Sequence, residues 1–343
     1  MGSSEAGPWQ LLPKALGTSA SPTCLLIAAF GLILHDLGNR AIDRIFPGAP
    51  AIPAVSADLN SIDSWMMDHA DDPIRWAKAA TRLIVEPPRV WFGPFRAVFN
   101  RDSTGGEVLH GGLAGTWGLV VWSILGAAIA RRSLIRLTGS TGATGMNASL
   151  AYAGRRSISL TIASIVPSVL IGLIALGMAG FGFLARHLGI WLAGLLGFLP
   201  TLGGLATATL LLILAGGWPL MVSAVAAEDE DGFDAFSRAA SYCTQRPLEY
   251  LYFLAIAGFL GIVGASAVAG FLMLAFGLEG WGLSIGSAIP APPGAIPVWP
   301  GVVRLLALGY VFAYPWAAWP TIYLILRRRI DGPDWDDIAS DGA

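Results

Sequence analysis

GGLAGTWGLVVWSILGAAIA, residues 111–130, is the stretch that decides the fold class. Its 20 consecutive residues include no charged side chain. An α-helix needs about 20 mainly apolar residues to cross the hydrocarbon core of a bilayer. Arg131 and Arg132 follow directly. We therefore predict a transmembrane helix that ends where the chain meets water.

Five further apolar stretches make this an all-α integral membrane protein, for which we predict a six-span helical bundle. The first stretch is the weakest, because its clean apolar run stops at Leu34. The fourth belongs to a longer apolar region that Pro200 interrupts, so we expect Leu188–Pro200 to be re-entrant or interfacial. The five stretches are residues 23–46, 157–183, 202–226, 250–278 and 302–326.

Composition supports lipid as the main solvent of the chain. Hydrophobic residues make up 55% of it and charged residues 13%, with a mean hydropathy of +0.63. A soluble domain carries roughly 25% charged residues. The net charge of −2 provides no basic field for nucleic acid. No nucleotide-binding, zinc or nucleophile motif is present, so we expect no cofactor and no enzymatic activity.

Arginine placement orients the spans. The connection 131–156 holds five arginines and no acid, three more stand at 327–329, and the connection 279–300 has no Lys or Arg. By the positive-inside rule, both termini are cytoplasmic in a bacterial inner membrane. The chain then divides into a cytoplasmic segment 1–22, a first span 23–46, an extracytoplasmic connection 47–110, a five-span core 111–326 and a cytoplasmic tail 327–343.

The extracytoplasmic connection carries helical signals. Pro73 opens a short helix that extends to Ile84. Beyond it, Trp91, Phe95, Val98 and Phe99 share one helical face. Such a face suits either a helix lying in the membrane interface or a small soluble cap packed on itself. We predict an extracytoplasmic helical cap.

The two cytoplasmic connections resemble each other. Gly145–Tyr152 precedes an arginine pair and the third span, and Gly232–Ala239 precedes Arg246 and the fifth span. In each, an Asn or Asp side chain is placed to cap a short helix. We predict two cytoplasmic amphipathic helices. The resemblance indicates either an internal repeat with a pseudo-symmetric core or a chance likeness between two amphipathic loops.

Part of the chain resembles a known group. Trp218–Glu228, Gly232–Tyr242 and Arg246-Pro247 are similar to the signature of uncharacterised bacterial polytopic proteins related to the membrane domain of glycerophosphodiester phosphodiesterases. Gly126–Ile165 looks like the preceding cytoplasmic hairpin of that group, and the resemblance covers about residues 111–326. The phosphodiesterase chemistry of that group belongs to a separate soluble barrel, so the resemblance implies a fold and no activity.

Candidate polar sites are few. Asp36 and Arg40 are helical neighbours in the first span, where they form either an ordinary rim or a buried polar track. Arg304 opens the last span and reads as a headgroup anchor. The cytoplasmic motif contributes further charged candidates, which are Glu228, Asp234, Arg238 and Arg246.

Two acidic clusters allow more than one interpretation. The run 228–231 is either a cation site or a set of acids that matches a helix dipole. Residues 68–72, with His69, form either a metal site or a solvated loop, while His110 stands alone. Neither cluster has metal-ligand spacing, so we expect no metal.

Three functions follow. The first is a non-catalytic structural or interaction module, whose partners are the lipid bilayer and a membrane-protein partner or a second copy of the chain. The alternative is a transporter or lipid-handling permease with a polar path near Asp36 and Arg40, where kinked spans would line the path. The third is an embedded hydrolase that uses His69.

Overall fold

The computed structural model describes residues 8–52, 73–139, 145–187, 194–286 and 298–332. Over these ranges the chain is helical and contains no strand. The elements are α1 (Pro8–Ser19), α2 (Pro22–Ile45), α4 (Pro73–Phe92), the 3-10 turn η1 (Gly93–Phe95), α5 (Arg96–Phe99), α6 (Gly105–Thr138), α7 (Met146–Arg155), α8 (Ser157–Ala185), α10 (Phe198–Leu212), the π-helical turn η2 (Ile213–Gly217), α11 (Trp218–Glu228), α12 (Gly232–Gln245), α13 (Pro247–Gly286) and α14 (Val298–Ile330).

Six of these helical segments are long and apolar enough to cross a membrane, which makes the chain a multi-pass membrane protein. They coincide with the six predicted stretches and confirm them. They are α2, α6, α8, the run from α10 through η2 to α11, α13 and α14. Each helix extends to or beyond its predicted stretch, except that α2 ends one residue earlier.

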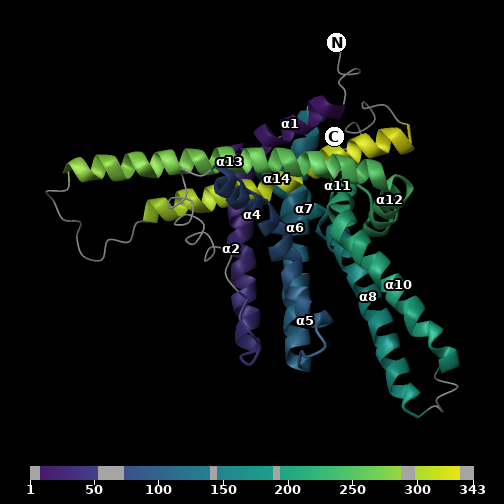
Figure 1. The fold of residues 1–343 in the computed structure, drawn as a ribbon. Coiled ribbons are helices and arrows are strands. Elements are labelled where there is room, and N and C mark those ends of the chain that lie inside the picture. The colour runs from purple at the N-terminus through teal and green to yellow at the C-terminus, as the bar shows by residue number, and fades with distance from the viewer. Residues whose placement is uncertain (1–7, 53–72, 140–144, 188–193, 287–297, 333–343) are drawn as a thin grey trace.

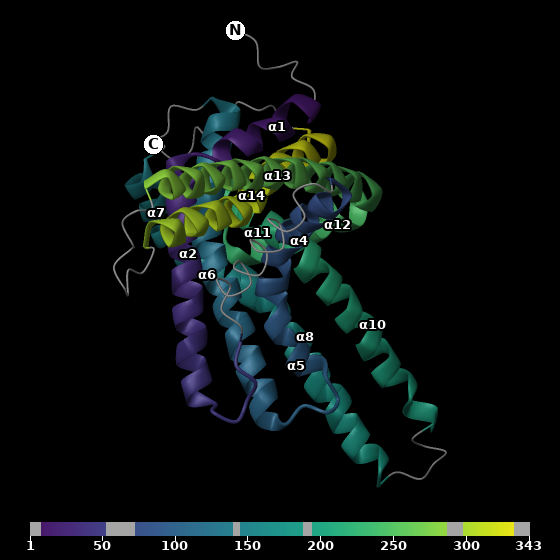
Figure 2. The same ribbon diagram turned by 60° about the vertical axis from the view of Figure 1, so that its left-hand side comes forward.

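The six helices form two crossed layers rather than one bundle of parallel spans. Figure 1 shows α2, α6, α8 and α10 running in broadly one direction, while α13 and α14 lie side by side across one end of them. The same crossing is visible after rotation (Figure 2). If the helices of one layer run along the membrane normal, the helices of the other layer therefore lie roughly in the plane of the membrane.

Burial differs sharply among the helices. In the most apolar part of each, 72% of the residues are buried in α6, but only 22% in α8 and 17% in α13. Large apolar side chains such as Leu176 and Phe271 are exposed on these two helices. Such continuous apolar surface is what the hydrocarbon of a bilayer covers.

Four tryptophans, which we call the tryptophan core, join the two layers. They are Trp91, Trp122, Trp218 and Trp316, and each is less than 2% exposed. Ring centroids of Trp91 and Trp316 lie 5.3 Å apart, and those of Trp218 and Trp316 lie 5.1 Å apart. Trp218 Nε1 also donates to the Oγ atoms of two serines at 2.8 and 2.9 Å.

The place of Trp91 alters the interpretation of the segment between the first two spans. Because its ring is in the tryptophan core, the C-terminal end of α4 packs against the other helices, whereas Arg82, Val85 and Arg89 of the same helix are exposed. The predicted aromatic face also splits, since Phe95 packs against Gly115, whereas Val98 and Phe99 are exposed. The strong aromatic packing of Trp91 outweighs the face that helical spacing alone suggests.

Glycines let the helices of the core approach closely. A Cβ atom on Gly126 of α6 would collide with the indole ring of Trp316. A Cβ atom on Gly309 of α14 would lie 2.9 Å from the carbonyl oxygen of Leu25. These two glycines therefore set how near α14 comes to α6 and α2.

The fourth span is less broken than predicted. From Phe198 onward the chain is continuously helical, and Pro200 lies in the first turn of α10, where proline is tolerated. The π-helical turn η2 instead precedes Pro219, and such a turn absorbs a misfit without ending a helix. Residues 188–193, in the predicted re-entrant piece, lie outside the described ranges.

Two further features differ from expectation. Helix α1 forms within the segment 1–22 and packs on α14 through buried Leu11 and Leu12. The sequence analysis did not predict this helix. The short helices α7 and α12 occupy both predicted cytoplasmic connections. The helices that follow them leave in different directions, since α8 runs with α6 while α13 crosses α11 (Figure 1). The expected pseudo-symmetry is therefore not seen.

Candidate functional site

A stripe of polar side chains runs along α2 on its inner face. His35, Asn39 and Asp43 follow one another at intervals of four residues, so they share one face of the helix. His35 is 1% exposed and Asn39 is 4% exposed. The predicted Asp36 and Arg40 lie one position further around the helix, where Asp36 is half-buried and Arg40 is exposed. The buried polar track therefore exists, but neighbouring residues carry it.

The lower end of this stripe pairs with α6. His110 Nε2 lies 2.7 Å from Asp43 Oδ1, and the imidazole is buried. The sequence analysis treated His110 as isolated, which is wrong. The two residues are 67 positions apart in the chain, so local spacing could not reveal the pair.

The upper end of the stripe is the His35–Asn39 pair. Asn39 Nδ2 lies 3.1 Å from His35 Nε2. Which atom donates depends on the tautomer of the imidazole and on the orientation of the amide. Within the described part of the chain, His35 Nδ1 and Asn39 Oδ1 are buried and have no hydrogen-bond partner. The pair thus contains two buried polar atoms that the protein does not satisfy.

Two contacts with α6 hold His35 in place. A Cβ atom on Gly118 would lie 3.0 Å from His35 Cε1, so only glycine leaves the ring its room. Trp117 Nε1 donates to the His35 carbonyl oxygen at 3.3 Å. One turn further along both helices, Gly31 faces the Trp122 ring. The polar stripe therefore ends against the tryptophan core.

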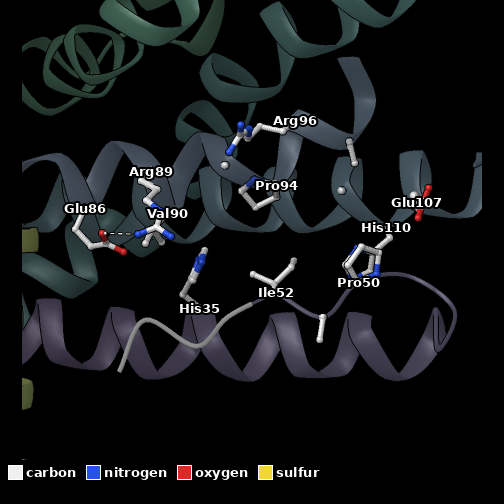
Figure 3. Close-up of a pocket in the computed structure, with 14 residues that line it drawn as sticks. His35, Pro50, Ile52, Glu86, Arg89, Val90, Pro94, Arg96, Glu107 and His110 are labelled. Carbon is white, nitrogen blue, oxygen red and sulfur yellow. Dashed lines mark hydrogen bonds and ion pairs between the residues drawn. The ribbon is translucent and has the colours of Figure 1, made fainter. Parts of the chain in front are cut away.

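A cavity of about 310 Å³ opens beside this stripe (Figure 3). His35 forms part of its wall and rises from α2 toward Arg89 and Val90 of α4. The remaining wall comes from residues 50–52, from η1 and α5, and from the start of α6. We call this cavity the polar pocket. Its charged and titratable lining residues are His35, Glu86, Arg89, Arg96, Glu107 and His110.

The charges of the polar pocket are only partly used within the protein. Arg89 and Glu86 form an ion pair at 3.4 Å. Glu107 Oε2 accepts the backbone N–H of Thr104 at 2.6 Å and completes the capping box that begins α6. Arg96 has no ion-pair or hydrogen-bond partner among the residues that the structure describes. The pocket therefore offers an unused guanidinium group.

The described lining has the mixed composition of a ligand-binding site. It contains no Ser, Thr, Cys, Lys or Tyr side chain that could act as a nucleophile. It does contain cationic, anionic and neutral hydrogen-bonding groups near one another. Such a mixture in a concave site is typical of ligand recognition.

A second polar cluster joins α11, α12 and α14. Glu228 forms an ion pair with Arg327 Nε at 2.8 Å and accepts hydrogen bonds from an Arg238 guanidinium nitrogen at 2.6 Å and from the Tyr323 hydroxyl. Arg238 also contacts Glu230. We call Glu228, Glu230, Arg238, Tyr323 and Arg327 the Glu228 cluster. It unites two of the four predicted motif residues and ties three helices together.

Burial perturbs one acid of this cluster. Desolvation raises the pKa of the Glu230 carboxyl to about 7 and outweighs the attraction of Arg238, and the negative charge of Glu228 adds to the rise. Glu230 therefore holds a proton near neutral pH more readily than an exposed carboxyl does.

The other predicted charged residues neither line the polar pocket nor form ion pairs with the Glu228 cluster. Arg246 pairs with Glu249 at 2.8 Å on the surface. Asp234 is in the first turn of α12, whose N-terminal cap is Asp231. Arg304 stacks on the Phe276 ring at 5.4 Å.

The two acidic clusters that the sequence offered as metal sites can be compared with the structure. In the described ranges no three His, Cys, Asp or Glu side chains gather as metal ligands would. Tyrosine and arginine groups occupy the acids at 228–230, whereas Asp231 caps α12. His69 and residues 68–72 lie outside those ranges.

No family model, no curated protein and no solved structure matches this chain.

Proposed function

We propose that this chain is a non-catalytic, permease-type membrane protein that binds a small polar ligand in the polar pocket. The carrying observation is His35, which is buried about halfway along a predicted span, has no partner for Nδ1 among the described residues and forms part of the wall of a cavity. Leaving a buried donor or acceptor unpaired costs about 1–3 kcal/mol. A polar group kept at membrane depth at such a cost is by default a functional group.

A binding pocket fits better than an open channel. Among the residues that the structure describes, the polar stripe of α2 ends at Trp122 and the tryptophan core and does not continue along α2 toward its N-terminus. Passage of a ligand would therefore need a second conformation, as alternating access requires. The embedded hydrolase, which would use His69 and the outer carboxylates, stays an alternative, because those residues lie outside the described ranges.

The proposed topology places α2, α6, α8 and the α10–α11 run across a bacterial inner membrane. Arg131 donates to the Ala226 carbonyl oxygen at 2.9 Å, and Arg327 pairs with Glu228 two residues later. Both arginine groups thus lie at one end, which we assign to the cytoplasm by the positive-inside rule. The polar pocket, near the junction of Ile45 and Gly105, then opens to the outside.

The uncovered apolar faces of α8 and α13 are assigned to lipid. These faces support the bilayer as a partner of the chain. We also propose that the fold is related to the membrane domain of glycerophosphodiester phosphodiesterases. An interaction module built only for lateral contacts would not need a buried, unsatisfied imidazole. That difference favours the permease over the interaction module.

Cysteine labelling tests the proposal. Cys24 and Cys243 are first replaced by alanine, and single cysteines are then introduced at Ala97, in the pocket wall, and at Ala128, which is fully buried. A small charged thiol reagent added from outside should modify the Ala97→Cys variant at least about tenfold faster, because reaction follows thiolate access. Equal, slow labelling of the two variants would show that water and ligands do not reach the pocket.

A further inference from the structure

We propose that the first turn of α2, together with Arg132 and Arg136 of α6, binds the phosphate of an anionic phospholipid. This site lies at the end of α2 opposite the polar pocket. The inference therefore goes beyond the proposed binding function and does not depend on it. It is argued from a buried arginine that has no partner and from the groups that surround it.

Arg132 is a buried cation without a counter-charge. The residue is only 7% exposed, and it forms no ion pair and no hydrogen bond with any residue that the structure describes. A guanidinium group keeps its charge at every physiological pH. Because burial of an unpaired charge is expensive, this group needs an anion that the described protein does not provide.

The end of the Arg132 guanidinium can be reached from outside. Its Nε atom is buried without a partner, whereas the two terminal nitrogens, which are also unpartnered among the described residues, are not fully buried. Arg136, one helical turn further along α6, is exposed and has no described partner either. The neighbouring Arg131, in contrast, donates to the Ala226 carbonyl oxygen and lies over the Tyr152 ring. Two of these three arginines are thus free to hold a ligand.

The packing of α2 against α6 brings the first turn of α2 to these arginines. Gly38 of α2 lies against Trp117, and the contacts move toward the C-terminus of α6 as α2 is followed back to its N-terminus. The Cys24 thiol is accordingly within electrostatic range of Arg132 and Arg136. Helix α1 contacts both helices at this end (Figure 2). The start of α2 and the two arginines therefore belong to one site.

The first turn of α2 has backbone donors to spare. Ser21 is the N-cap, but its hydroxyl donates to the Thr18 carbonyl oxygen at 2.7 Å and makes no capping hydrogen bond. Pro22 has no N–H, and the N–H groups of Thr23 and Cys24 have no acceptor among the described residues. The N-terminus of a helix attracts anions through such N–H groups and through its dipole. Unused backbone donors therefore add to the two unused guanidinium groups.

The depth of the site favours a lipid over a free anion. The uncharged run of α6 ends at Ala130, so at 1.5 Å per residue Arg132 and Arg136 lie about 3 and 9 Å beyond it. The headgroup layer on each side of a bilayer is roughly 5–8 Å thick, which is where lipid phosphates are found. The outward face of α2 that continues from this end is apolar, with Leu26 and Phe30 exposed. Acyl chains can lie along this face while the phosphate meets the arginines.

An ordinary membrane anchor explains Arg136 but not Arg132. Arg136 stands in the last turn of α6, where a cation complements the helix dipole, and an exposed arginine at the end of a span commonly extends to the headgroups. Arg132 is instead enclosed by the protein. The specific part of the proposal is therefore tested at Arg132.

Native mass spectrometry of the purified full chain in mild detergent measures the ligand preference. The chain is titrated with short-chain phosphatidylglycerol, short-chain phosphatidylcholine and inorganic phosphate. We expect phosphatidylglycerol to bind about tenfold or more tightly than either of the others, because the cationic site favours a net negative headgroup and the apolar face of α2 holds its chains. Equal binding of the two lipids would overturn the anionic headgroup, and equally tight binding of phosphate would show that the ligand is a free solute.

Variants separate a lipid site from a structural arginine. Arg132→Met keeps much of the length and removes the charge, so it should weaken phosphatidylglycerol binding about tenfold or more. Without lipid, its melting temperature should equal or exceed that of the original chain, because an unpaired buried charge has been removed. A lower melting temperature, or a variant that fails to fold, would show that Arg132 serves the fold and would overturn the proposal.

Arg155→Gln is the matched control. Arg155 is an exposed arginine in the last turn of α7, in a connection that the proposed topology places on the same side of the membrane. This variant should leave the affinity for phosphatidylglycerol unchanged. If it weakens binding as much as Arg132→Met does, the lipid is held by a diffuse basic surface and the assignment to Arg132 is wrong.

Discussion

Replacing Glu228 by glutamine, which exchanges one carboxylate oxygen for an amide nitrogen, should strongly destabilise the folded chain. Glu228 is the shared ion-pair partner of Arg238 and Arg327, and its side chain is only 13% exposed. The substitution keeps the size and removes the charge. It leaves two guanidinium groups facing each other beside α11 without the carboxylate that separates them.

The magnitude follows from burial. Breaking a buried ion pair by removing one partner costs about 3–5 kcal/mol. Arg327 is as buried as Glu228, but Arg238 is 32% exposed and keeps Glu230 as a partner, so solvent and that second acid soften the loss. We expect Glu228→Gln to lower the free energy of unfolding by about 2–4 kcal/mol.

Unfolding by sodium dodecyl sulfate in mild detergent, followed by tryptophan fluorescence, measures this loss. The matched control is Glu249→Gln, which also removes a carboxylate between two arginines, Arg246 and Arg329. Those partners are more than 40% exposed, so the control should cost about 0–1 kcal/mol. Equal losses in the two variants would refute the claim that burial makes the Glu228 cluster a structural tie.

Three other changes should separate packing, hydrogen bonding and titration. The pKa of Glu230 is about 7 in the folded chain against an ordinary 4.5, so protonation favours the folded state. The free energy of unfolding should therefore be highest below pH 4.5 and fall by less than about 3 kcal/mol as pH rises through 7. Glu230→Gln should flatten that decline in detergent unfolding curves. Trp218→Phe should cost about 1–3 kcal/mol more than Trp316→Phe in the same assay, because only Trp218 donates to two buried serines, and equal costs would contradict the hydrogen bonds. Gly126→Leu should destabilise by about 1–3 kcal/mol or more through collision with the indole of Trp316, whereas Gly258→Leu, with open space at its Cβ, should not; similar melting temperatures would argue against the close approach of α6 and α14.

The spans were predictable because hydrophobic length depends on the sequence alone. Residues 111–130 have no charge, and a bilayer imposes a minimum length on any helix that crosses it. The direction of each helix was not predictable in this way. It depends on which rings meet, and Trp91 meets Trp316, which lies 225 positions later in the sequence.

The presence of a polar stripe in the first span could be predicted from the sequence, but not which residues of that helix are buried. The four-residue spacing of polar side chains in the first span indicated a stripe, but two stripes lie side by side, and the sequence analysis chose the one with Asp36 and Arg40. The buried stripe begins with Gly31 and continues through His35 and Asn39. A glycine in line with polar residues marks the face on which another helix can approach closely, and that signal was present in the sequence.

The packing of α14 also governs the order in which this protein can be completed during synthesis. The rings of Trp91 and Trp218 contact Trp316, the first tilted and the second edge-on, and Trp122 stacks on Phe312. Each of these early residues therefore lacks its ring partner until residues more than 80 positions later have been translated. Until α14 leaves the translocon, the earlier helices can insert but cannot close around these rings. A ribosome that stalls before Phe312 would therefore release a chain with unpaired aromatic surface, the kind of intermediate that membrane proteases remove.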